Sequence, residues 1–135
     1  MKTDAINTTA LAFMGDAVYE VYVREHVMES GQQAADKLHR MAVKYVCAES
    51  QAAAVKAMFD DLSEDEQKLV KRARNRKSAT KPRNTDPVTY KWATAFEALV
   101  GYLHISGDRD RAEEIINEAI AFADNGRGGN EKENR

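Results

Sequence analysis

The stretch Leu11-Ala12-Phe13-Met14-Gly15-Asp16-Ala17-Val18 places a carboxylate and a glycine inside an apolar run. Apolar residues recur at helical spacing through this run, which predicts one helix from about Ala10 to Ser30. Aspartate is rarely fully buried unless it is paired or bound to a cation, so Asp16 is a candidate functional residue. Taken alone, however, the helix also fits a simpler interpretation, in which Glu20 and Arg24 form a surface ion pair and Asp16 lies at the edge of the core.

A second carboxylate lies in the most apolar part of the chain. Glu97 is flanked by apolar residues over 95–100, and Gly101 follows one helical turn later on the same face. Glycine inside a helix costs about 1 kcal/mol relative to alanine, so it usually has a packing reason. We therefore expect the two helices to cross closely at Gly15 and Gly101, which would bring both carboxylates into one partly desolvated cluster. Two carboxylates so placed repel unless protonation or a divalent cation relieves them, and their hard oxygens suit Mg²⁺.

The remaining segments are also helical in pattern. Residues 33–59 are rich in alanine, and the cluster at 46–50 leaves open whether they form one helix or two. Capping signals predict three more helices: Ser63 to about Arg74, Val88 to Ile105 after the cap Asp86-Pro87, and from Asp108 to near Ala123. The sequence therefore predicts an all-α fold, a single domain of six or seven helices over residues 1–124 and a disordered tail over residues 125–135.

The composition fits one domain of an intracellular protein. The chain has 135 residues, 43% of them hydrophobic, and it contains no apolar run of the roughly 20 residues that span a bilayer. Its single cysteine, Cys47, cannot form an intrachain disulfide, and the N-terminus lacks the pattern of a secretory signal. We therefore expect a cytoplasmic protein that does not contact a membrane.

The charge of the chain is unevenly distributed. Eight basic residues and no acidic one lie between Glu66 and Asp86, although the net charge of the whole chain is only −2. The rest of the chain holds 12 basic and 22 acidic residues, a formal charge of −10. This pattern indicates a localised phosphate-binding surface or a region that pairs with the acidic body, while a solvated loop is the usual alternative. We call residues 68–83 the basic segment; its charges are Lys68, Lys71, Arg72, Arg74, Arg76, Lys77, Lys81 and Arg83.

Both acidic motifs resemble those of a known family. The stretch Phe13 to Val18 resembles the F-L-G-D-A-V core of the ribonuclease III signature, and Thr94 to Gly101 resembles the second acidic motif of that family. The intervening residues, Arg74 to Ser78, Asn84 to Asp86 and then Thr89-Tyr90, are similar to the short branch, mini-ribonuclease III. The resemblance covers about residues 9–123, with both motifs and the loop in the right order.

The resemblance implies a fold, an activity and a set of site residues. It implies a ribonuclease III-like domain that acts as a homodimer and uses Mg²⁺ to hydrolyse double-stranded RNA, with precursor ribosomal RNA of the large subunit (23S) as its substrate. Asp16 and Glu97 would be the catalytic residues and the metal ligands, with Asp86 as a further candidate ligand. The basic segment would bind RNA, chiefly through Arg72, Arg74, Arg76, Lys77, Lys81 and Arg83.

The sequence departs from the longer ribonucleases III at three acidic positions, where it carries Thr9, Ala12 and Thr94. These departures leave open the number of metal ions. They also leave open an alternative, a noncatalytic ribonuclease III-like module that binds RNA or associates with the ribosome. A third possibility is a helical protein-interaction domain whose basic segment pairs with an acidic partner.

Overall fold

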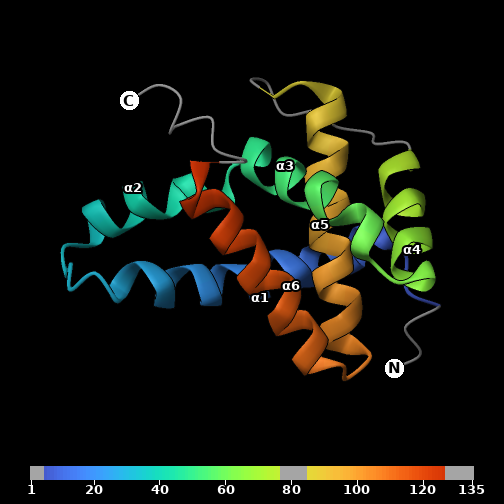
Figure 1. Ribbon diagram of the computed structural model, residues 1–135, viewed down its shortest axis with the longest axis horizontal. Helices are drawn as coiled ribbons and strands as arrows, with labels where there is room; N and C mark the ends of the chain where they lie inside the picture. The colour runs from blue at the N-terminus through green and yellow to red at the C-terminus, as the bar shows by residue number, and fades with distance from the viewer. Residues whose placement is uncertain (1–4, 77–84, 127–135) are drawn as a thin grey trace.

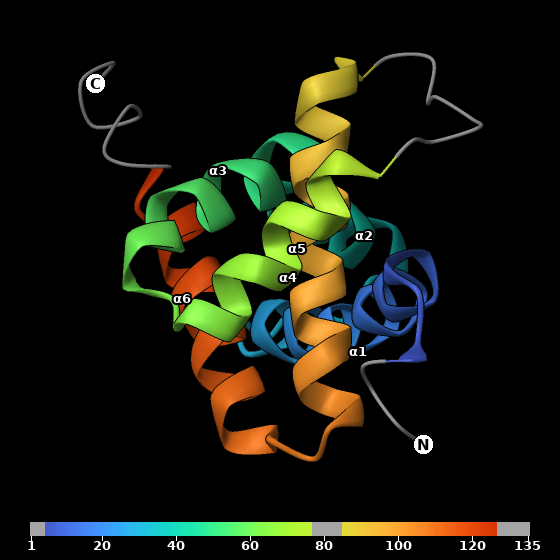
Figure 2. The ribbon, with the colours of Figure 1, turned by 90° about the vertical axis from the view of Figure 1, so that its right-hand side faces the viewer.

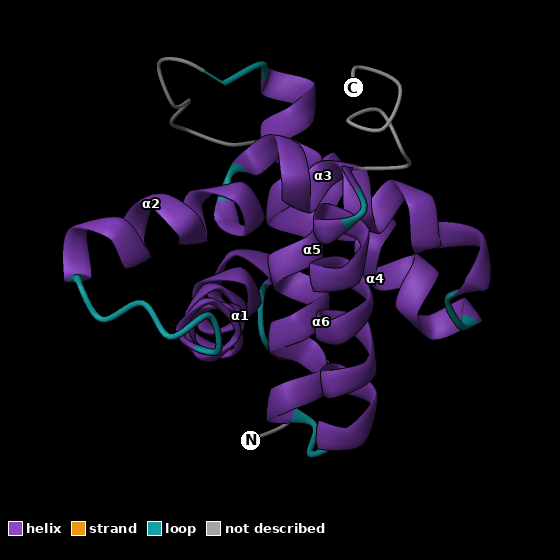
Figure 3. Ribbon diagram, turned by 60° about the vertical axis from the view of Figure 1, so that its left-hand side comes forward, coloured by secondary structure: helices purple, strands orange, loops and turns teal. Residues whose placement is uncertain are grey.

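The computed structural model describes residues 5–76 and 85–126, and every regular element in these two ranges is helical (Figures 1 and 3). The all-α prediction is confirmed, and six α-helices in these ranges agree with the predicted six or seven. Their bounds are α1 Thr8–Met28, α2 Ala35–Val46, α3 Ala48–Met58, α4 Glu64–Asn75, α5 Pro87–Ile105 and α6 Arg109–Asp124, with a 3₁₀ helix η2 at Phe59–Asp61.

Three helices begin where the capping signals in the sequence predict. The Ser63 backbone N–H donates to the Glu66 carboxylate (2.9 Å) and the Glu66 backbone N–H donates to the Ser63 hydroxyl (3.2 Å), which closes the capping box of α4. The side chains of Asp86 and Asp108 accept hydrogen bonds from the first turns of α5 and α6. Each of these side chains satisfies backbone donors that a helix start leaves without an intrahelical partner.

Residues 33–59 contain two helices because the backbone at Cys47 is extended (φ −65°, ψ 153°) and separates α2 from α3. The first helix, α1, ends at Met28, two residues before the predicted end. Gly31 follows with φ +90°, a backbone conformation that residues with a side chain rarely adopt.

Helix α5 lies at the centre of the domain and packs against α1, α3 and α4 (Figure 2). Helix α6 packs on α5 and α3, and α2 packs on α1. Phe96 and Leu99 of α5 have no exposed surface, and the Tyr19 ring of α1 meets the Phe96 ring edge-on at 4.9 Å between centroids. Because other helices pack against α5 on several sides, most of its side chains are apolar. A carboxylate on this helix loses hydration and destabilises the fold unless it has a partner.

None of the helices in the described ranges combines the length and the apolarity needed to cross a membrane. Helix α6 ends at Asp124, where we expected the domain to end. The predicted disordered tail falls outside the described residues from residue 127 onward, so the division of the chain at residue 124 stays a prediction.

Candidate active site

The site is built on a close crossing of α1 and α5 at two glycines. A Cβ atom on Gly15 would lie 1.7 Å from the backbone carbonyl oxygen of Glu97, and a Cβ atom on Gly101 would lie 1.9 Å from the carbonyl oxygen of Leu11. No side chain fits at either position, since contacts below 3.0 Å with backbone atoms cannot be relieved by a rotamer change. The close approach inferred from the two in-helix glycines is therefore confirmed.

The crossing brings Asp16 close enough to Glu97 for the two carboxylates to interact electrostatically. Glu97 is half-buried, as expected for a carboxylate on the central helix, whereas Asp16 is exposed. The expectation that Asp16 would be sheltered from solvent was wrong, because the core-facing residues of α1 at this level are Ala12 and Gly15, and Asp16 lies at the rim of the crossing.

The environment of Glu97 favours its neutral form. Burial raises the pKa of Glu97 to about 8, and the negative charge of Asp16, its hydrogen bond with Glu97 and the charge of Glu20 act in the same direction. The side chain of Gln51 acts in the opposite direction, because an amide N–H that donates to a carboxylate stabilises the charged form. The rim of the crossing thus holds more negative charge than its surroundings neutralise, so it favours a proton or a cation.

Asp86 is not brought to this pair. Its carboxylate caps α5, accepting from the backbone N–H of Thr89 at 3.1 Å and from its hydroxyl at 3.3 Å. Asp86 precedes Glu97 by eleven residues, which separates the two by roughly 16 Å along the helix axis. Asp86 therefore caps α5, and its position does not support a role as a metal ligand.

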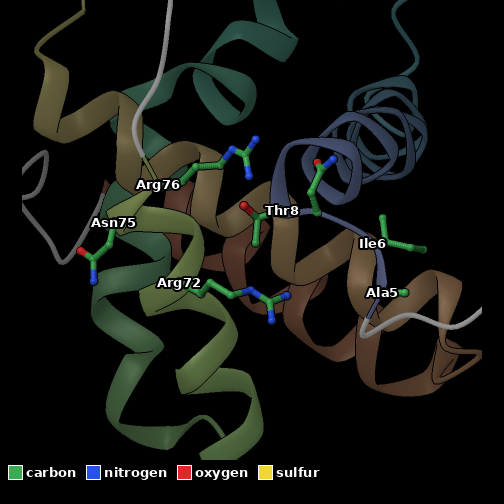
Figure 4. Close-up of a pocket in the computed structure, with 7 residues that line it drawn as sticks. Ala5, Ile6, Thr8, Arg72, Asn75 and Arg76 are labelled. Carbon is green, nitrogen blue, oxygen red and sulfur yellow. The ribbon is translucent and has the colours of Figure 1, made fainter.

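The basic residues near the end of α4 divide into two groups. Arg72 and Arg76 extend from α4 toward the first residues of α1 and line an open pocket of about 490 Å³, together with Asn75 and residues 5–8 (Figure 4). Arg74 instead lies over the Trp92 ring of α5, 4.9 Å from its centroid, and donates to the Asn75 side chain at 3.1 Å. The other predicted RNA-binding residues, Lys77, Lys81 and Arg83, lie outside the described residues.

Known proteins share both the sequence and the fold. A family model described as the ribonuclease III domain matches residues 9–108. The chain is 46% identical over 117 residues to Mini-ribonuclease 3 of Enterococcus faecalis, covering 85% of this chain and 89% of that protein. It is 44% identical over 122 residues to Mini-ribonuclease 3 of Streptococcus pneumoniae, with coverage of 89% and 95%. The chain belongs to the mini-ribonuclease 3 branch of the ribonuclease III family.

A solved structure supports the same assignment. The crystal structure of a protein from Fusobacterium nucleatum matches this fold with a TM-score of 0.78 and 31% sequence identity, covering 87% of this chain and 93% of that chain. Membership in the family makes the protein an endoribonuclease of the ribonuclease III type. The resemblance stated for the two acidic motifs is therefore confirmed.

The oxygen donors at the crossing fit a divalent ion that keeps most of its water ligands. Ribonuclease III enzymes generally depend on a divalent metal. In the described parts of this mini-ribonuclease, no three or more His, Cys, Asp or Glu side chains gather as metal ligands. Two carboxylates, Asp16 and Glu97, match the few hard ligands that protein-bound Mg²⁺ takes, and they do not match the four ligands of a structural zinc site.

The ion pair of the simpler interpretation also exists. The Arg24 guanidinium donates to the Glu20 carboxylate at 3.1 Å on the surface of α1. Glu20 nevertheless contributes to the electrostatics of the acidic pair, because its charge helps to raise the pKa of Glu97. The Glu20–Arg24 surface pair therefore lies on the same helix as Asp16, one member of the acidic pair.

Sequence reasoning missed Gln51, a buried side chain in contact with Glu97. The available signal was a long polar residue in an alanine-rich stretch, directly after the cluster that suggested a break between two helices. The contact itself was not visible in the sequence, because it requires α3 to lie on α5 at this level.

Proposed function

We propose that this mini-ribonuclease 3 family member is a Mg²⁺-dependent endoribonuclease that cleaves double-stranded RNA as a homodimer in the cytoplasm. Its substrate class is precursor ribosomal RNA, specifically the 23S precursor that the resemblance to the mini branch implies. The observation that carries the proposal is the Asp16–Glu97 pair, which two glycines hold together at the crossing of α1 and α5.

Asp16 and Glu97 hold the ion in this proposal, directly or through its waters. The bound ion would lower the pKa of a water molecule and neutralise charge on the phosphate and on the leaving oxygen. The exposed Asp16 carboxylate faces solvent, where an RNA backbone can approach it. The half-buried Glu97 carboxylate contributes charge from the protein side and lies on α5, the helix that packs against α1, α3 and α4.

The pocket at the start of α1 supports an RNA-binding role for Arg72 and Arg76. The pocket reaches Thr8, which lies eight residues before Asp16 and thus roughly 12 Å along the axis of α1. One nucleic-acid strand can therefore contact both the guanidinium groups and the acidic pair. Phosphate contacts of this kind suit an A-form duplex, which proteins recognise mostly by shape and backbone.

A second copy of the chain is the proposed partner, as is general in the ribonuclease III family. Phe13 and Val21 are 81% and 56% exposed, and they flank the exposed Ala17 at intervals of four residues on one face of α1. Large exposed apolar side chains on one face are typical of an interaction surface. Twofold symmetry matches an antiparallel duplex, so each subunit would cleave one strand.

The alternative, a noncatalytic RNA-binding module, is favoured by the three positions at which this chain lacks the acidic residues of the longer ribonucleases III. Ala12 is buried, Thr9 is exposed, and the Thr94 hydroxyl donates to the Tyr90 carbonyl at 3.0 Å. None of these side chains supplies a third carboxylate to the pair.

Cleavage of long double-stranded RNA by the purified protein, with and without Mg²⁺, separates the two functions. The enzyme cuts the duplex only with metal and leaves single-stranded RNA of the same sequence intact. A noncatalytic module binds the duplex under both conditions and leaves it whole. Loss of cleavage in Asp16→Asn and Glu97→Gln excludes a contaminating nuclease.

A further inference from the structure

Two cations from different helices lie over one aromatic ring of α5. The Lys56 ammonium of α3 is 5.5 Å from the centroid of the Trp92 ring, and the Arg74 guanidinium of α4 is 4.9 Å from it. Helices α3 and α4 both pack on α5, and each cation lies in the last turn of its helix (Figure 2). Lys56 lies outside the basic segment, so the charge pattern of the sequence does not single it out.

The Trp92 ring is held in place from the protein side. It is half-buried and packs against the hydrophobic core. The Phe59 ring meets it edge-on with 6.4 Å between centroids, and the Gln67 amide donates to the Phe59 carbonyl at 2.8 Å, which ties η2 to α4. Cations that lie on this supported ring lose part of their freedom before any ligand binds.

The ring positions these cations without neutralising them, because an aromatic ring attracts a cation through its quadrupole and has no net charge. Within the part of the chain that the structure describes, no ion pair includes Lys56 or Arg74. Arg74 donates to the neutral Asn75 side chain, whereas Lys68 on the same helix pairs with Glu64 at 3.4 Å. Two fixed positive charges of this kind favour an anionic ligand.

Arg74 and the pocket arginines lie on different sides of α4. Arg74 is two residues from both Arg72 and Arg76, and two residues of an α-helix turn through roughly 200°. Arg72 and Arg76 accordingly extend toward α1, while Arg74 lies over Trp92 (Figure 4). A ligand that contacts both sides has to reach across a helix that is about 10–12 Å thick with its side chains. A duplex can do so, because its phosphates line both edges of a wide, shallow minor groove.

We propose that Lys56, Arg74 and Trp92 form a second phosphate-binding site, which takes the backbone of duplex RNA on the side of α4 away from the Arg72–Arg76 pocket. We call these three residues the Trp92 site. Lys56 and Arg74 contact phosphate in this inference, and Trp92 is a positioning residue that holds both cations. The inference rests on the RNA-binding part of the proposed function and on no part of its chemistry.

The first test compares three variants that each remove one positive charge. Lys56→Gln and Arg74→Gln change the Trp92 site, and Lys37→Gln is the matched control, since Lys37 is an exposed lysine on α2. Binding of the full chain to duplex RNA is measured across a salt series in a chelating buffer. Each test variant should reduce the slope of log affinity against log salt by roughly 0.9, if the value for B-DNA applies, and the control should leave it unchanged.

The second test removes the ring and keeps both charges. Trp92→Leu should weaken binding by roughly threefold or more at each salt concentration, because the two cations then lose their freedom only when RNA binds. Trp92→Phe retains an aromatic face and should bind nearly like the wild type. In the Trp92→Leu background, Lys56→Gln should cost less affinity than in the wild type. If Trp92→Leu does not fold, Lys56→Gln decides alone, because Lys56 is exposed and its substitution leaves the core intact.

The outcomes separate this inference from the proposed catalysis. If Lys56→Gln and Lys37→Gln give the same slope, the Trp92 site is an ordinary solvated surface and the inference is overturned. It is also overturned if Lys56→Gln weakens binding to polyglutamate but not to duplex RNA, which would assign the site to an acidic protein. A wild type that binds the duplex but does not cut it with Mg²⁺ contradicts the endonuclease, while the slopes still decide the Trp92 site. Failure to bind duplex RNA contradicts both.

Discussion

Gly15 and Gly101 face each other across α1 and α5, and a Cβ atom on either one would meet backbone atoms of the opposite helix. This contact sets the distance between the two helix axes at the level of the acidic pair. Asp16 directly follows one of these glycines and Glu97 lies one turn before the other, so the approach of the backbones determines how close the two carboxylates come.

Gly15→Ala should therefore damage the fold itself. A Cβ atom 1.7 Å from the Glu97 carbonyl oxygen forces the helices apart, and we expect the free energy of unfolding to fall by more than about 3 kcal/mol. Chemical denaturation measures the loss. Gly107→Ala is the control, because Gly107 has φ +88° and open space around it, so only backbone strain of roughly 1 kcal/mol applies. An equal loss in the two variants would show that the crossing tolerates a methyl group.

Asp16→Asn and Glu97→Gln should each reduce cleavage of duplex RNA by more than about 100-fold, because they remove the proposed metal ligands. The shape of each side chain hardly changes, so the fold and RNA binding should persist. Single-turnover cleavage and filter binding measure the two effects. Asp86→Asn serves as the control, since asparagine caps a helix as well as aspartate does. Near-normal turnover in either test variant would remove that residue from the metal site.

The stability of the metal-free protein should decrease as pH rises from about 5 to about 8. The pKa of Glu97 is about 8 in the folded protein and 4.5 in its ordinary state, so the folded protein retains a proton that the unfolded chain releases. Stability falls with pH wherever the folded state binds more protons. Melting temperatures across this range in a chelating buffer report the slope, and Glu97→Gln should flatten it. Parallel curves for the two proteins would mean that Glu97 is not held neutral.

Removal of both pocket arginines should weaken RNA binding and its dependence on salt. We expect Arg72→Gln with Arg76→Gln to reduce the slope of log affinity against log salt by roughly 0.9 per lost phosphate contact, if the value for B-DNA applies. Lys68→Gln with Lys71→Gln removes the same charge from the same helix outside the pocket. If both double variants lose the same slope, net charge and not the pocket determines affinity. Cleavage at saturating RNA should change little in either.

Phe13→Asp should convert a dimer into a monomer of 15.1 kDa, as measured by light scattering at micromolar concentration. A charge on the exposed face of α1 would have to be buried without a partner in the dimer. Val88→Asp, at another exposed apolar residue near the start of α5, should leave the mass unchanged. A wild-type protein that is monomeric and still cuts both strands would contradict the homodimer.

The sequence was informative where local rules operate. A glycine within a helix has a known cost, so Gly15 and Gly101 predict a close crossing from the sequence alone, and the structure shows it. Capping signals at Ser63 and Asp86 located helix starts for the same reason. The family resemblance then identified the acidic pair, which residue chemistry alone left as one interpretation among several.

Other contacts between distant segments were not predictable. The burial of Gln51 depends on α3 packing against α5, and the stacking of Arg74 on Trp92 depends on α4 ending beside α5. Asp16 was expected to be sheltered because its sequence neighbours are apolar, yet the rim of the crossing leaves it exposed. Only the tertiary arrangement decides which side of a helix faces water.

The side chains packed around the Trp92 ring make changes at the end of α4 detectable by fluorescence. Trp92 is the only tryptophan of the chain, and its ring lies under the Arg74 guanidinium, with the Lys56 ammonium 5.5 Å from its centroid and the Phe59 ring edge-on at 6.4 Å. Indole fluorescence is sensitive to nearby cations and to solvent. The protein therefore carries an intrinsic optical reporter beside the last turn of α4, and ligand binding at the neighbouring Arg72 and Arg76 can be followed in the unlabelled molecule.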